Sequence, residues 1–281
     1  MIEPGIYVPF IAITTAAFSF YNLILYHSYP IPFKLRKVKD PLELRKLFYD
    51  YVTAISSFIH AVILIVGSSI VLYVIGIDYN RPNANEENLL IAFSIGYFIS
   101  DTILGIFAGY NDNIMLMHHL FGLFGLTYSL IKQNYGNTIV FAFVVAEISN
   151  PFMILRKNLD KHKGAEALSI FSGVIFSLTF IICRTVIIGY VMIPFFITDA
   201  SLLIKLFGGF LWYLSLYWCY VIINLLIKAL MEITNARFLI SIYSKLSKWR
   251  KNGNFLLIMH LCFITLCFSI TLFKWNHREI I

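Results

Sequence analysis

The sequence contains little charge: only 13% of its 281 residues are Asp, Glu, Lys or Arg, whereas 59% are hydrophobic. Ordinary soluble domains contain about 25% charged residues. This deficit excludes an ordinary soluble domain. Together with a mean hydropathy of +0.78, it predicts an all-α, polytopic integral membrane protein.

Cysteine is also scarce. The four cysteines all lie in apolar segments, at Cys183, Cys219, Cys262 and Cys267. They lack the paired spacing of a zinc site, and a buried cysteine is usually a small hydrophobic side chain. We therefore expect no disulfide framework. The N-terminus lacks a basic region followed by a small-residue cleavage site, so we also expect no cleavable signal peptide.

Long runs of apolar residues dominate the sequence. A helix that crosses a bilayer needs about 20 mostly apolar residues. The sequence predicts about eight such spans, at 6–27, 51–77, 88–109, 114–131, 137–155, 168–190, 202–230 and 255–273. Asp40-Pro41 predicts the start of a surface helix before the second span, with an N-cap acid and a proline at the first position. Pro151 should kink the fifth span and free a backbone carbonyl nearby.

Basic residues are distributed unevenly between the loops. With eight spans, sixteen of the 22 Lys and Arg residues fall on one side and four on the other, while Arg184 and Lys205 lie within spans. Basic loops usually stay in the cytosol, or in the matrix of a mitochondrion. We therefore predict that both termini face the opposite side. The net charge of +7 then reflects membrane orientation, and no nucleic-acid partner is expected.

Several ionisable residues fall inside the predicted spans. They are His60, Asp101, the adjacent His118 and His119, and Glu147. At 1.5 Å per residue, the two acids lie about 12 Å from the basic side and the histidine pair about 6–8 Å. Ionisable groups at such depth usually face the interior of a helix bundle and pair with one another. We therefore predict that these residues line one cavity.

The histidine pair leaves two interpretations open. Neighbouring helical positions point about 100° apart, so one of His118 and His119 should face the interior and the other a neighbouring helix. This geometry argues against a metal site, which favours i, i+4 spacing. An imidazole oriented by Asp101 could act as a base or a transient acyl acceptor. Alternatively, the pair is structural and bonds to Asp101 or Glu147, or Asp101 pairs with Arg184.

Five motifs in this order resemble the TLC-domain membrane proteins, which include the ceramide synthases. They are Ser57-Phe58-Ile59-His60-Ala61, Gly96-Tyr97-Phe98-Ile99-Ser100-Asp101, Met117-His118-His119-Leu120, Ala146-Glu147-Ile148-Ser149-Asn150-Pro151-Phe152 and the in-span Arg184. The resemblance implies a six-helix barrel around a lipid-accessible cavity, formed here by spans two to seven. The implied domains are 1–45 (an N-terminal helix and basic loop), 46–232 (the TLC domain) and 233–281 (a basic linker and last helix).

The resemblance also implies a chemistry. Ceramide synthases use a histidine pair to move an acyl group from acyl-CoA to a sphingoid amine. The implied catalytic residues are His118, His119 and Asp101, and the implied lipid-cavity residues are His60, Glu147, Asn150 and Arg184. Acyl-CoA would be a substrate, and no cofactor is expected. Ceramide synthases carry further acids after the pair, where this sequence has only Glu147, so it is more similar to the subgroup named only for containing a TLC domain.

The sequence thus predicts a multi-pass protein that binds or handles a lipid acyl chain, with or without acyl transfer. Membrane lipids are the expected partners, and the endoplasmic reticulum or the mitochondrial inner membrane is the expected location. The alternative is a non-catalytic accessory subunit of a larger membrane complex, which would bind other membrane-protein subunits.

Overall fold

A computed structural model describes residues 3–234 of the chain, except 33, 80, 110–112, 161, 163, 198 and 199. The predicted span at 255–273 and the basic linker before it lie outside the described residues. The chain divides into two compact units, with the boundary between Ile188 and Gly189.

Helices make up the named elements of the described chain, which confirms the all-α class. The first unit contains α1 (Tyr7–Ser28), α2 (Pro41–Ile75), α3 (Asn85–Ala108), α4 (Asn113–Lys132), α5 (Gly136–Glu147), α6 (Asn150–Leu159), α7 (Glu166–Ile181), the short turns η1 (Pro4–Ile6) and η2 (Leu35–Lys37), and the π-helical segment η3 (Ile182–Ile187). α8 (Ile188–Ile197) begins at the boundary, and α9 (Leu202–Thr234) belongs to the second unit. In this part of the chain, seven helical stretches are long and apolar enough to span a membrane, and they coincide with the first seven predicted spans.

Helix α2 is longer than predicted. The sequence suggested a separate surface helix before a span from Tyr51, but the structure has one continuous helix of 35 residues from Pro41. The helix is continuous because no glycine or proline interrupts the chain between Pro41 and Tyr51. The predicted start is confirmed: Asp40 Oδ1 accepts a hydrogen bond of 3.0 Å from the Leu42 amide.

The predicted break in the fifth span occurs just before Pro151. α5 ends at Glu147 and α6 begins at Asn150, because a proline nitrogen cannot donate to the carbonyl one turn earlier. α6 then continues to Leu159, four residues beyond the predicted end. Glu147 therefore lies twelve residues from the basic end, at about 18 Å rather than 12 Å along the helix.

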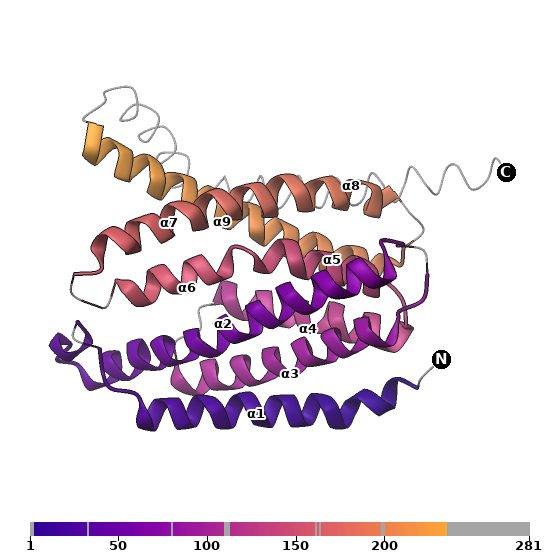
Figure 1. Cartoon of the computed structure of the whole chain (residues 1–281), viewed down its shortest axis with the longest axis horizontal. Coiled ribbons are helices and arrows are strands. Elements are labelled where there is room, and N and C mark those ends of the chain that lie inside the picture. The colour runs from indigo at the N-terminus through magenta and orange to yellow at the C-terminus, as the bar shows by residue number, and fades with distance from the viewer. Residues whose placement is uncertain are drawn as a thin grey trace. The chain divides into compact units, whose positions relative to one another are not determined.

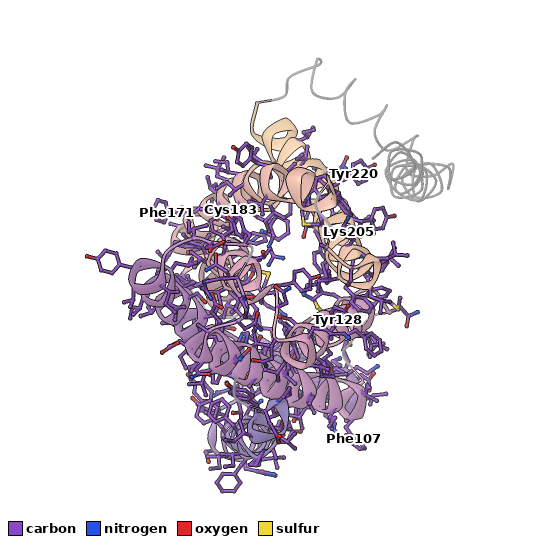
Figure 2. All side chains as sticks on the ribbon, turned by 90° about the vertical axis from the view of Figure 1, so that its right-hand side faces the viewer. Phe107, Tyr128, Phe171, Cys183, Lys205 and Tyr220 are labelled. Carbon is purple, nitrogen blue, oxygen red and sulfur yellow. The ribbon has the colours of Figure 1, made fainter. Side chains whose placement is uncertain are left out.

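The helices of the first unit pack around an apolar core. α1 runs beside α3, while α2 contacts α3, α5 and α6 (Figure 1). Leu64, Ile91 and Val140 are fully buried. Phe107 and Phe171, in contrast, are 78% and 60% exposed and lie at the periphery of this unit in Figure 2. Such an apolar exterior is what contact with lipid tails requires.

A buried polar network joins helix ends on the side opposite the basic loops. The Glu87 carboxylate is 0% exposed and accepts hydrogen bonds from Arg81 at 2.5 and 3.0 Å, from the Ala84 amide at 2.9 Å and from Asn137 at 3.0 Å. Asn137 also donates to the Gly76 carbonyl. These bonds offset the cost of burying the carboxylate. The third predicted span begins at residue 88, whereas α3 begins three residues earlier at Asn85, and this network holds Glu87 in its first turn.

Candidate functional site

His119 is held by two neighbouring residues of α3. Its Nε2 lies 3.5 Å from Asp101 Oδ2, and its Nδ1 lies 3.1 Å from the Thr102 hydroxyl. His119 is 5% exposed and Thr102 is also buried. The distance to Asp101 is that of an ion pair rather than of a short hydrogen bond. Both ring nitrogens of His119 thus have a partner on the adjacent helix.

His118 faces a different direction from His119, because neighbouring helical positions differ by about 100°. Its ring meets Phe98 edge-on, with centroids 6.3 Å apart, and lies 5.8 Å from the His119 ring. The charge of Arg184 also acts on His118. His118 therefore contacts Phe98 and His119 directly and lies within electrostatic range of Arg184.

Arg184 lies in the π-helical turn η3. A π-turn adds one residue to a helical turn and redirects the side chains, often at functional sites. Arg184 Nη2 donates to the Ala146 carbonyl at 2.9 Å, and its Cζ lies 5.3 Å from the centre of the Phe180 ring, within cation–π range. Ala146 is next to the break between α5 and α6. Arg184 thus bonds a backbone carbonyl beside the kink that Pro151 causes.

Glu147 and Asn150 face each other across the same break. Asn150 Nδ2 donates to Glu147 Oε2 at 2.7 Å. The positive charge of Arg184 acts on Glu147. Arg184 is 8% exposed, so solvent screens this interaction only weakly. The kink therefore brings an acid, an amide and a guanidinium together within the membrane.

His60 is buried in an aromatic stack that adjoins Phe98. Its ring is parallel to that of Tyr97 within 16°, with centroids 3.8 Å apart. His60 Nε2 lies 3.3 Å from the Ser94 hydroxyl, and the Tyr97 hydroxyl lies 2.8 Å from Ser57 Oγ. These contacts fix His60 between α2 and α3.

Phe98 contacts all three histidines of the site. Its ring centroid lies 5.3 Å from that of His119, 5.9 Å from that of His60 and 6.3 Å from that of His118. Phe98 belongs to one of the sequence motifs, but the motif predicts no role for it, and the sequence reasoning missed Thr102 and Ser94 entirely. Hydroxyl side chains beside ionisable residues within an apolar span are the signal that could have found the latter two.

The candidate residues therefore form two connected groups within the first unit. Asp101, Thr102 and His119 form one; Glu147, Asn150 and Arg184 form the other; His118 interacts with both, and His60 adjoins the first through Phe98. Such a site can donate and accept hydrogen bonds, move a proton and stabilise an oxyanion. Within the residues that the structure describes, no group of three or more His, Cys, Asp or Glu side chains could hold a metal ion.

Comparison with known proteins places this arrangement in a family. The family model of the TLC domain matches residues 44–232. The chain belongs to the TLC domain family. This TLC protein is therefore a multi-pass protein whose apolar helices are in contact with membrane lipids. The match includes each predicted site residue and begins after α1.

A curated relative agrees with this assignment. A TLC domain-containing protein of Acanthamoeba polyphaga mimivirus is 26% identical over 147 residues, covering 49% of this chain and 72% of the relative. It is named for the domain rather than as a ceramide synthase, in agreement with the subgroup that the motifs indicated. No solved structure matches the chain significantly.

Proposed function

We propose that this TLC protein binds the polar end of an acyl-bearing lipid at His118, Arg184 and Glu147, inside the membrane. The observation that supports the proposal is the geometry beside the kink, where Asn150 donates to Glu147 and Arg184 donates to the Ala146 carbonyl. Ionisable groups in a membrane span are costly, and they commonly mark a ligand or proton pathway. Their presence together is therefore best explained by a polar group that they bind.

Each of the three groups suits one part of a lipid headgroup. The Arg184 guanidinium can donate two parallel hydrogen bonds to a phosphate, or donate to an ester or amide oxygen. Glu147, oriented by Asn150, can accept from a hydroxyl or an amine. His118 can do either, depending on its protonation. The acyl chain would lie along the apolar side chains that make up most of each span.

The same groups suit acyl transfer from acyl-CoA to an amine. His118 would take the proton from the amine as the new carbon–nitrogen bond forms. Arg184 would stabilise the oxyanion of the tetrahedral intermediate, and coenzyme A would leave as the thiol, receiving the proton from His118. His119, with both nitrogens engaged, would position its neighbour. This hypothesis gives the two histidines different roles.

The second candidate is a non-catalytic accessory subunit of a membrane complex, in the endoplasmic reticulum or the mitochondrial inner membrane. The observation in its favour is that His119 and His60 are both bonded to hydroxyl groups within the interior. Contacts of this kind stabilise helix packing without any reaction. In this case the site is structural, and replacing its residues should first of all lower the Tm.

Purified full-length chain tests both candidates. We would measure co-purifying lipid by mass spectrometry, acyl transfer from acyl-CoA to a sphingoid amine, and the Tm, comparing His118→Ala with His27→Ala. His27 is exposed on α1 and is the matched control. Lipid binding predicts that H118A loses bound lipid at a nearly unchanged Tm. An accessory role predicts no retained lipid in the wild type and a lower Tm for H118A.

A further inference from the structure

The helix that precedes the family match packs directly against the candidate site. α1 ends at Ser28, whereas the TLC match begins at residue 44. Even so, the ring of Phe18 in α1 meets Tyr97 edge-on, with centroids 5.1 Å apart and planes at 73°. It also lies 6.4 Å from the His60 ring, at 72°. Phe18 is only 8% exposed, so α1 covers this side of the site.

Contacts on either side of Phe18 fix the position of α1 along α3. Ser19 Oγ lies 2.9 Å from Ser100 Oγ. One turn before Phe18, Thr14 occupies the space beside Gly96, where a Cβ would come within 2.7 Å of the threonine Cβ. Small residues permit such close approach of membrane helices. The register of Phe18 against Tyr97 and His60 is therefore determined by the packing of the two helices.

We propose that Phe18 is a positioning residue of the site, which holds the stacked Tyr97 and His60 rings in place for ligand binding. Edge-to-face contact on both rings opposes their sliding or tilting. His60 in turn adjoins Phe98, which contacts His118 and His119. The functional unit then includes α1 as well as the matched TLC domain. The inference rests on the proposed lipid binding only where the test below measures retained lipid.

The test uses full-length chain with Phe18→Ala, Phe18→Leu and the control Phe20→Ala. Phe20 lies on the same helix and is 67% exposed. Leucine at position 18 keeps most of the apolar volume and so guards against loss of folding. We would follow modification of His60 by diethyl pyrocarbonate with peptide mass spectrometry, using the exposed His27 as the internal reference. Retained lipid and Tm would be measured on the same samples.

We expect His60 to react several-fold faster in F18A and F18L, with a matching loss of retained lipid, while F20A behaves as the wild type. F18L should show this at a Tm close to that of the wild type, which a general loss of packing would not produce. His60 reactivity equal to that of F20A overturns the inference, and so does faster reaction with unchanged lipid. A wild type that retains no lipid contradicts the proposed function, and His60 reactivity alone then decides whether Phe18 positions the stack.

Discussion

Asp101 and His119 pair across two helices, with 3.5 Å between Oδ2 on α3 and Nε2 on α4. The two residues lie on different helices, so the pair depends on how α3 and α4 are rotated against each other. With Thr102 on the second ring nitrogen, the contact fixes both the tautomer and the orientation of the imidazole. The interaction free energy of Asp101 and His119 can be measured separately from their other contacts.

A double-mutant cycle should give a favourable coupling between Asp101 and His119. We expect Asp101→Asn and His119→Gln to show an interaction free energy of about 0.5–3 kcal/mol in unfolding measurements. The matched control is the more exposed pair of Lys157 and Asp50, for which about 0.2–1 kcal/mol is expected. A coupling for the buried pair no larger than that of the control would contradict a structural role for this contact.

Replacing Arg184 with methionine should destabilise the protein strongly. The change removes the hydrogen bond from Arg184 to the buried Ala146 carbonyl and the positive charge that acts on Glu147, and an unsatisfied buried acceptor costs about 1–3 kcal/mol. Adding Glu147→Gln should recover part of the Tm, because the remaining charge is removed. Arg45→Met, at an exposed position of α2, is the control and should have little effect. Failure of E147Q to restore any stability would show that the two charges are independent.

The Arg81–Glu87 pair should matter for stability rather than for lipid binding. Arg81→Met removes the partner of a fully buried carboxylate, with an expected cost of about 3–5 kcal/mol. Arg36→Met is a suitable comparison, because Arg36 is exposed and its Nε donates to the Ile31 carbonyl. We would measure Tm and co-purifying lipid together. Selective loss of lipid at an unchanged Tm would place this network in the ligand site and refute the prediction.

Gly96→Ala should weaken the packing of α1. The new methyl group would approach the Ile11 carbonyl oxygen to 2.9 Å and Thr14 Cβ to 2.7 Å, so the helices must separate, at about 1–3 kcal/mol. Gly5→Ala is the matched control, since a Cβ there meets nothing within 4 Å. Thermal unfolding of the two variants compares them directly. If Phe18 positions the site, G96A should also increase the reactivity of His60.

The membrane class, the positions of the first seven spans and the helix start at Asp40 were determined by the sequence itself. These features depend on local composition, because a bilayer requires a certain length of apolar helix and a cap requires a particular side chain. The break before Pro151 is local for the same reason. Ionisable residues are conspicuous within apolar spans, so the sequence alone also identifies His118, His119, Asp101, Glu147 and Arg184 as candidates. Their membership of one cavity in a six-helix barrel stays a prediction.

Only the tertiary structure decided which residues meet. Hydropathy and helix length give the depth of a residue in the membrane, but not the direction in which it faces around its helix axis. The pairing of His119 with Asp101 and Thr102, the hydrogen bond from Arg184 to Ala146, and the central place of Phe98 all depend on that rotation. The contact of Phe18 with His60 depends in addition on the register of α1 against α3. Rotation and register are set by side-chain packing between segments distant in sequence, where small residues such as Gly96 allow close approach.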